Sequence, residues 1–325
     1  MFVCVCFINN SPVIAVQMAG GELTGEIKLT ADTTLTSTIK IPANKTLTLD
    51  LNGYVLDHYN DERPIVVNLG STLIIKDSNP NRTHYGSLTD GLWIYNSSAT
   101  SGIKIEGGII TGGVKSDRGG AIFNKGTVIM EGGTIAGCKA IPNSNSTEIS
   151  MQNYLVNTFT NGTAGAIFID ETASFTMNGG AIRYCKSSPF SEATLSGGGA
   201  VFVDANANKA GTFTMNNGEI SNCSSLNGGA VYVHSNLTAG NTAEQAAVFN
   251  MTGGKITDCH STNTAAQSGG GAVYVNATQA ASGSVASIGK FNMSGGTLEK
   301  NTSDSMGGAV YLLGYFNMYD GVEIA

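Results

Sequence analysis

The sequence is short of charged residues, and of basic residues above all. Asp, Glu, Lys and Arg make up 13% of the 325 residues, about half of the share that is usual in soluble proteins. Lys and Arg together number 17, and they form no cluster along the chain. We therefore expect no nucleic-acid partner and no binding to an anionic membrane surface.

Proline and long apolar runs are also scarce. No stretch of about 18 apolar residues occurs, so no transmembrane segment is predicted. Only 6 residues are Pro, whereas Gly is abundant at 43 residues. Gly together with many Thr, Ser and Asn residues is typical of short strands joined by tight turns. Hydrophobic residues reach 41%, which is too many for a disordered chain.

Residues 1–19 are interpreted as a truncated signal peptide. They are mostly apolar and contain the small residues Ala15 and Ala19, but no basic residue precedes Lys28. An ordinary buried first strand is the alternative interpretation. An export signal would make the protein secreted or place it on the cell surface.

A Gly-Gly-Ala repeat organises the chain from residue 101 to residue 325. Its copies are spaced unevenly, and their alanines are Ala121, Ala166, Ala200, Ala230, Ala272 and Ala309. A second motif, Phe-x-Met-x-Gly-Gly-x-Ile, follows each copy, and its versions begin at Val128, Phe175, Phe213, Phe249, Phe291 and Phe316.

Each repeat holds three short apolar runs, which are too short for helices and fit strands. One coil of three strands cannot bury its apolar face alone, so neighbouring coils must stack. The sequence predicts an all-β fold, a right-handed parallel β-helix, which is a solenoid with three short strands per coil and variable loop insertions. We interpret the unequal copy lengths as insertions confined to one loop.

Residues 20–100 are predicted to form irregular N-terminal coils that cap the solenoid. Residues 101–325 are predicted to form the regular coils, and the segment SGIKIEGGIITGG from Ser101 is interpreted as an early repeat. The last repeat stops in the middle of a coil, so we expect the same solenoid to continue beyond residue 325.

The repeats resemble the Gly-rich β-helix repeats of bacterial surface proteins, namely pectin-lyase-like proteins and the polymorphic outer-membrane or adhesin type. The resemblance covers roughly residues 46–325 and rests on the two motifs above. It implies the fold and a surface location. The outer-membrane type also carries Phe-x-x-Asn, which is matched at Asn178 and Asn216, whereas Thr252 and Ser294 stand at that spacing in later copies.

One position of the repeat holds a cysteine in four successive copies and then an asparagine. These residues are Cys138, Cys185, Cys223, Cys259 and Asn301. We interpret them as an inert structural ladder, because stacked strands lie about 4.8 Å apart and disulfide Cβ atoms about 3.8 Å apart. One or two disulfides or a metal site are the alternatives. No metal and no cofactor is predicted.

Candidates for catalysis are few. Pectin-lyase-like enzymes that cleave acidic polysaccharides use clustered acidic and basic side chains, and no such cluster is recognisable. Glu106 and Glu131 precede Gly-Gly in two repeats, so stacking would bring them about 5 Å apart, the separation of a retaining glycosidase pair. Two solvated turn residues are the alternative. The run Trp93–Asn96 is similar to the W-I-D-H run of pectate lyases, with its Asp and His replaced.

A second candidate is an aromatic stripe on the strand face opposite the aliphatic residues. Its members are Phe123, Phe168, Phe202, Tyr232, Tyr274 and Tyr311. An exposed stripe of this kind would suit the apolar faces of sugars and would mark a ligand-binding surface. Loops that fold over the stripe, or a reversed assignment of the two faces, are the alternatives.

The preferred hypothesis is an adhesin-like module that presents loops, and the aromatic stripe, to a glycan or to a host or matrix protein. A polysaccharide-degrading lyase or hydrolase is the second hypothesis, and a passive spacer is the third. A non-enzymatic role is preferred, because no dense cluster of ionisable residues is recognisable.

Overall fold

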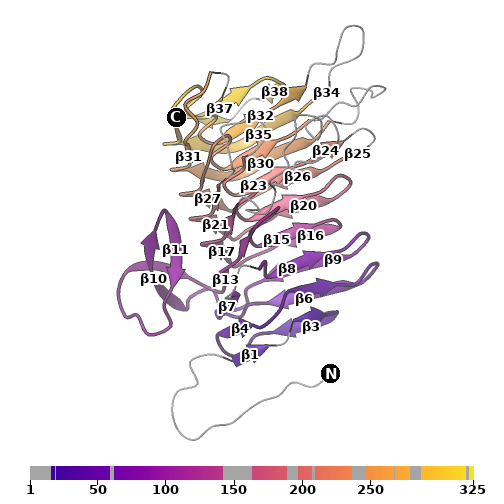
Figure 1. Cartoon of the computed structure of the whole chain (residues 1–325), viewed down its shortest axis with the longest axis vertical. Coiled ribbons are helices and arrows are strands. Elements are labelled where there is room, and N and C mark those ends of the chain that lie inside the picture. Colours follow the sequence, from indigo (N-terminus) through magenta and orange to yellow (C-terminus); the bar gives the residue numbers. More distant parts are fainter. Residues whose placement is uncertain are drawn as a thin grey trace, which may run out of the picture.

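The computed structural model describes residues 16–18, 20–58, 62–141, 163–188, 197–206, 209–235, 246–266, 268–278, 287–319 and 322–325. Within these ranges the chain forms strands and turns, and no helix that is long and apolar enough to cross a membrane is present. Successive coils stack along one axis as a parallel β-helix (Figure 1).

The first strand of each coil belongs to a nine-stranded parallel sheet. Its members are β2 (Gly21–Glu22), β5 (Ile39–Ile41), β8 (Ile65–Val67), β15 (Ile122–Asn124), β19 (Ile167–Ile169), β23 (Val201–Val203), β29 (Val231–Val233), β32 (Val273–Val275) and β37 (Val310–Leu312).

The second and third strands share a sheet of 17 strands. The second strands are β3 (Gly25–Lys28), β6 (Thr46–Asp50), β9 (Thr72–Lys76), β16 (Thr127–Met130), β20 (Ser174–Met177), β26 (Thr212–Met215) and β38 (Tyr315–Met318). The third strands are β1 (Val16–Met18), β4 (Thr33–Leu35), β7 (Val55–His58), β13 (Ile109–Thr111), β17 (Thr134–Ala136), β21 (Ala181–Arg183), β27 (Glu219–Ser221) and β39 (Glu323–Ile324). The long strands β30 (Val248–Thr257) and β35 (Lys290–Glu299) serve as second and third strands together.

A fourth strand of two residues completes most coils, which the sequence did not predict. It recurs in a six-stranded sheet of β14 (Val114–Lys115), β18 (Lys139–Ala140), β22 (Lys186–Ser187), β28 (Ser224–Ser225), β31 (His260–Ser261) and β36 (Thr302–Ser303). Two small hairpins, β24 (Ala205–Asn206) with β25 (Lys209–Ala210) and β33 (Ala277–Thr278) with β34 (Ser287–Ile288), lie between first and second strands.

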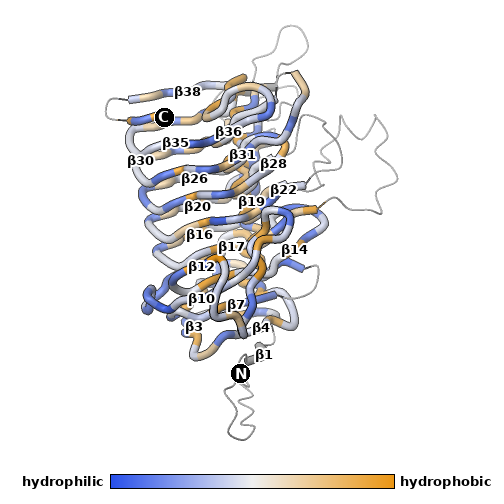
Figure 2. The backbone as a smooth tube through the Cα atoms, turned by 90° about the vertical axis from the view of Figure 1, so that its left-hand side faces the viewer, coloured by the Kyte–Doolittle hydropathy of each residue, from blue (hydrophilic) through white to orange (hydrophobic). Residues whose placement is uncertain are grey.

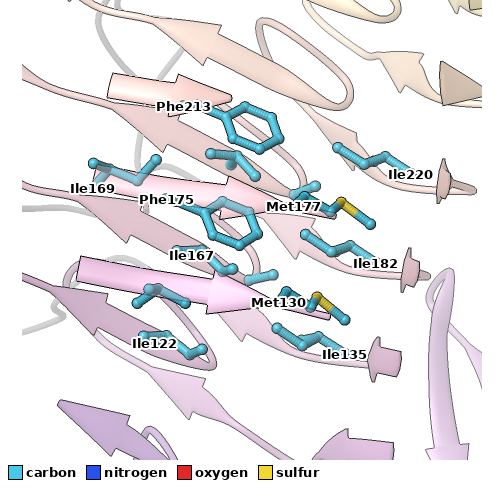
Figure 3. Close-up of a cluster of buried hydrophobic side chains, with 14 of the residues drawn as sticks. Ile122, Met130, Ile135, Ile167, Ile169, Phe175, Met177, Ile182, Phe213 and Ile220 are labelled. Atoms are coloured by element: carbon cyan, nitrogen blue, oxygen red, sulfur yellow. The ribbon is translucent and has the colours of Figure 1, made fainter. Parts of the chain in front are cut away.

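The interior of the solenoid is filled as the repeat predicts. The Phe and Met positions of the second strands are buried and pair in register, Met177 with Met215 and Phe175 with Phe213. Figure 3 shows Phe175 and Phe213 in this interior. The phenyl rings stack with centroids 4.7–4.9 Å apart from Phe175 to Phe316. The outward residues between Phe and Met are only half-buried, so side chains along each short strand alternate between the core and the solvent side. Figure 2 shows these strands stacked in successive layers.

From β13 to β35, the corner after each third strand has a left-handed backbone. Gly112 and Gly137 adopt positive φ there, and so do Tyr184, Asn222, Asp258 and Lys300 in later coils. Gly, Asn and Asp reach this region at low cost, whereas Tyr and Lys rarely adopt it. The recurring corner therefore keeps its geometry although its residue type changes from coil to coil.

Two of the predictions about organisation are wrong. Insertions are not confined to one loop, because extra residues separate first from second strands, as between Val233 and Val248, and fourth from first strands, as between Ala140 and Ile167. The segment from Ser101 is not a repeat throughout. Its residues Ile103–Glu106 form β12, which pairs antiparallel with β10 (Thr83–Thr89) outside the stacked sheets.

The last described coil leaves inward positions exposed that are buried in earlier coils. Leu312 is 42% exposed and Met318 is 58% exposed, whereas Val275 and Met293 at the same positions of the previous coil are fully buried. Stacking of a further coil is what buries these positions elsewhere in the chain. A continuation beyond residue 325 stays a prediction.

Truncation of one stacked phenylalanine is expected to destabilise the solenoid. Phe213→Ala removes a fully buried ring that contacts Phe175 and Phe249, so the free energy of unfolding should fall by about 3–5 kcal/mol in denaturant titrations. Thr214→Ala, on the outward side of the same strand, is the control and should change it by less than about 1 kcal/mol. Equal effects of the two variants would contradict the assigned faces.

One core residue makes stability depend on pH. His58 is fully buried, and neither ring nitrogen has a hydrogen-bond partner among the described residues. Burial lowers the pKa of its imidazole below the usual 6.5. A His with a depressed pKa in the folded state stabilises the fold only while it stays neutral. Its contribution is complete above about pH 6.5, the pKa of the unfolded chain, and is lost as the pH falls further.

The free energy of unfolding, measured from pH 7.5 to 5, should decrease as the pH falls. His58→Leu removes the titrating group and should flatten that dependence. His260→Gln, at a partly exposed position, is the matched control and should keep the slope of the parent protein. An unchanged slope in His58→Leu would assign the pH dependence to other groups.

Candidate functional site

An inserted three-stranded sheet covers part of the outer face of the third strands. It consists of β10, β11 (Leu92–Tyr95) and β12, and it leaves the solenoid after β9 and returns at β13 (Figure 1). Trp93 and Ile105 of this sheet pack on Val55, Ile109 and Ala136, which form a small core outside the solenoid. The indole N–H of Trp93 donates a hydrogen bond to the carbonyl of Ile103 at 2.9 Å, which holds β11 against the returning chain.

A cleft of about 400 Å³ lies where the inserted sheet meets β4 and β7. Its lining combines two carboxylates, several hydroxyl groups, one amide and one phenol. The lining residues are Asp32, Thr33, Thr34, Val55, Asp57, Ser87, Ile94, Tyr95, Asn96 and Ser97.

Asp32 is held in place by two hydrogen bonds. The Tyr95 hydroxyl donates to Oδ2 at 2.7 Å, and the backbone N–H of Val55 donates to Oδ1 at 3.0 Å. The Tyr95 ring stacks on Trp93 and meets His84 edge-on, with centroids 5.9 Å apart in each case. Burial and the hydrogen bond to Asp32 raise the pKa of Tyr95, so the phenol stays protonated and acts as a donor.

Asp57 is half-buried, and fewer hydrogen bonds stabilise its carboxylate than stabilise that of Asp32. Burial raises the pKa of this carboxyl, and the backbone N–H of His58 counteracts that rise. The structure shows no ion pair to Asp57 within the described part of the chain. A Cβ added to Gly112 would overlap Asp57 Oδ1. The Asp57 carboxylate therefore occupies the space beside the next coil that any side chain at position 112 would fill.

The register of the sheet places the two carboxylates on one face. Thr34 pairs with Asp57 across β4 and β7, so Asp32 lies two residues earlier along the neighbouring strand. Strand spacing and rise separate the two Cα atoms by about 8 Å. Among the described residues, no three His, Cys, Asp or Glu side chains lie close enough to hold a metal ion together.

A second cleft of about 250 Å³ adjoins the first and shares Ser87 and Asn96 with it. Its other lining residues are small or apolar, namely Gly86, Ala99, Ser101, Gly102 and Ile103. The two clefts are therefore neighbours on the inserted sheet. A ligand long enough to reach both would meet the carboxylates in the first and small, mostly apolar residues in the second.

The chain has no match among the known proteins compared with it: models of protein families, curated proteins and solved structures all gave none. The parallel β-helix therefore rests on the structure itself, and the site must be judged from its own geometry.

The predicted pair of Glu106 and Glu131 is not formed. Glu106 belongs to β12 and pairs with Thr83, whereas Glu131 follows β16 and lies beside Lys76. Both carboxylates are exposed, and each pairs with a lysine, at 2.7 Å from Lys104 and 3.7 Å from Lys76. The inserted sheet takes Glu106 out of the stack, so spacing along the chain was a misleading guide to its position.

The predicted aromatic stripe exists in register but is not an open surface. Its residues pair as expected and lie on the side opposite the main core, with Phe168, Phe202, Tyr232 and Tyr274 at most 2% exposed. Cations cover its first rings, because Arg63 and Lys125 lie over Phe123 and Arg118 lies over Phe168. Ligand binding by the stripe stays a prediction, now without an accessible surface to support it.

The cysteine ladder has the structure that was predicted for it. Cys138, Cys185, Cys223 and Cys259 are free thiols, buried, and stacked at one corner. Each Sγ lies 3.4–3.5 Å from the carbonyl oxygen two residues earlier. Burial raises the pKa of Cys185 and Cys223 well above the usual range, which disfavours the reactive thiolate. Asn301 ends the ladder and accepts from the Cys259 N–H at 3.1 Å.

Sequence reasoning missed the two aspartates of the cleft. Asp32 precedes a strand and Asp57 lies within one. In the sequence, neither aspartate differs from the solvent-facing polar residues that are usual at such positions. The usable signal was the run Trp93–Asn96, because Ile94, Tyr95 and Asn96 of this run line the cleft. The sequence offered no reason to assign a role to this run, because the Asp and His of the pectate-lyase run are replaced in it, and it did not reveal which carboxylates the run approaches.

The space beside Asp57 can be tested with two glycines of similar backbone geometry. Gly112 and Gly91 have φ of 74° and 77°, but a Cβ would meet Asp57 and His58 only at Gly112 and open space at Gly91. Gly91→Ala should cost only the strain of the left-handed backbone, about 1–2 kcal/mol. Gly112→Ala should lower the free energy of unfolding by clearly more, because the Asp57 carboxylate must move. Equal losses would show that Asp57 does not occupy this space.

Proposed function

We propose that the chain is a secreted or cell-surface β-helix module that binds a glycan in the cleft between the inserted sheet and strands β4 and β7. The observation that carries this proposal is the lining of the cleft. Carboxylate, hydroxyl and amide groups converge there beside Tyr95, in a space that is large enough for one or two sugar rings.

The chemistry of the lining suits sugar hydroxyl groups. A carbohydrate presents many groups that both donate and accept, and it needs partners of both kinds at fixed positions. The Asp57 carboxylate accepts hydrogen bonds, the Asn96 amide donates and accepts, and Thr34 and Ser87 do both. The continuation into the second cleft fits a chain of several sugars better than a single small ligand.

The architecture is compatible with the adhesin-like role that we propose. A rigid stack of coils holds an inserted sheet away from its axis, which is where solenoid proteins place binding surfaces. The repeats resemble those of pectin-lyase-like and adhesin-type surface proteins, and the scarcity of basic residues favours a partner that is not an anionic polymer.

Cleavage of the glycan is a second candidate function, and the pair of carboxylates favours it. Asp57, with its raised pKa, is suited to donate a proton to a leaving oxygen. Asp32 is a carboxylate fixed by Tyr95 and Val55 on the same face of the sheet. Two carboxyl groups that flank a bound sugar are what glycoside hydrolysis requires.

Affinity electrophoresis through gels that contain single polysaccharides would test both functions. We expect retardation of the protein in at least one gel and no cleared zone in the stained polymer. Tyr95→Phe removes the hydrogen bond to Asp32 and should weaken the retardation about two- to tenfold. Glu131→Gln, at an exposed position on another face, is the control and should migrate like the parent protein.

Cleared zones that disappear in Asp57→Asn would establish hydrolysis or elimination instead of binding alone. Unaltered migration in every gel would reject the glycan proposal and leave a protein-binding or spacer role. Weakened retardation in Glu131→Gln together with normal retardation in Tyr95→Phe would place the binding surface away from the cleft.

A further inference from the structure

We infer that the cleft selects sugars that carry a free, protonated amino group over neutral and acidic sugars. This inference rests on the proposed glycan binding and names the class of glycan. It follows from the distribution of charge in and around the cleft, which holds two carboxylates and no Lys, Arg or His among its lining residues.

Two basic groups lie near the cleft, and neither is among its lining residues. The guanidinium of Arg82 lies over the Tyr54 ring, 4.2 Å from its centroid. His84 Nε2 lies 2.7 Å from the carbonyl oxygen of Gly53 and is buried behind Tyr95. An acidic sugar would therefore meet Asp32 and Asp57 without a cation to receive its carboxylate, which is unfavourable for binding.

The two carboxylates differ in how many hydrogen bonds they already accept. Asp32 already accepts hydrogen bonds from the Tyr95 hydroxyl and the Val55 N–H. Asp57 receives the N–H of His58 but has no cationic partner within the described residues, although it is half-buried. A half-buried carboxylate without a counter-charge is costly, and a ligand ammonium group would offset that cost.

A glycan fits this arrangement better than the lysine side chain of a peptide. The ammonium subsite is flanked by the hydroxyl groups of Thr34, Ser87 and Ser97 and by the amide of Asn96. Beyond them, the second cleft presents Ser101 beside Gly86 and Gly102. The hydroxyl and amide groups of the first cleft match the hydroxyl-rich surface of neighbouring sugars.

Isothermal titration calorimetry with oligosaccharides of equal length would test the inference. The probes are a β-1,4-glucosamine oligomer, its fully N-acetylated form and a galacturonate oligomer. At a pH low enough to protonate the amines, we expect the free-amine oligomer to bind at least about tenfold more tightly than the acetylated one, since a charge-assisted hydrogen bond differs from a neutral one by that much. The galacturonate oligomer should not bind detectably.

Asp57→Asn should abolish the tenfold preference while leaving the affinity for the acetylated oligomer within about twofold, because the amide keeps the shape of the carboxylate. Glu131→Gln is matched in chemistry, lies outside the cleft and should keep the full preference. Added salt should reduce the preference of the parent protein in parallel.

Three outcomes would overturn the inference. Equal binding of the free-amine and acetylated oligomers would reject amine selection and leave glycan binding intact. A preference that survives in Asp57→Asn would place the ammonium subsite elsewhere. Binding of an oligolysine peptide that is as tight as that of the free-amine oligomer would show a general cation site. Absence of binding for every sugar would instead reject the proposed function itself.

Discussion

The parallel pairing of each coil with the next is the constraint on which the rest of this structure depends. A single coil has no other element against which to bury its apolar side chains. The interior therefore forms only because equivalent residues of successive coils stack at the spacing of parallel strands. The stacked phenyl rings, 4.7–4.9 Å apart, and the free thiols of four successive coils are direct results of that spacing. Side chains that repeat along the chain therefore contact copies of themselves, and interior positions tolerate little change of size.

The same constraint builds the candidate site. Pairing of β4 with β7 brings Asp32 and Asp57, which belong to different coils, onto one outer face. The inserted sheet leaves the solenoid after Lys76, and the chain returns at Gly107. The sheet therefore folds back over neighbouring strands and forms one side of the cleft. The low content of basic residues has a local consequence there, because Asp57 has no cationic partner among the described residues. Under the proposed glycan binding, the charge of the cleft would decide the class of ligand more than its shape would.

Other faces of the solenoid are less suited to ligands for reasons that are equally physical. The aromatic stripe is buried, with Arg63, Arg118 and Lys125 lying over its first rings, so its apolar area is already used in packing. The cysteines lie inside the stack, and burial disfavours the thiolates of Cys185 and Cys223. Exposed ion pairs such as Lys104 with Glu106 hold surface residues together and enclose no space in which a substrate could be bound.

The amino-acid sequence by itself determined the repeated coil, the inward Phe and Met, the outward Thr and Asn, and the cysteine ladder. Each of these depends on alternation within a strand and on equivalence between repeats, which are local properties that spacing reveals. Only the tertiary structure decided that Glu106 leaves the stack, that most of the aromatic stripe is buried, and that Asp32 and Asp57 lie on one face in the cleft beside Tyr95. These outcomes depend on where an insertion of unrelated sequence folds, and contacts between an insertion and a distant coil have no period along the chain.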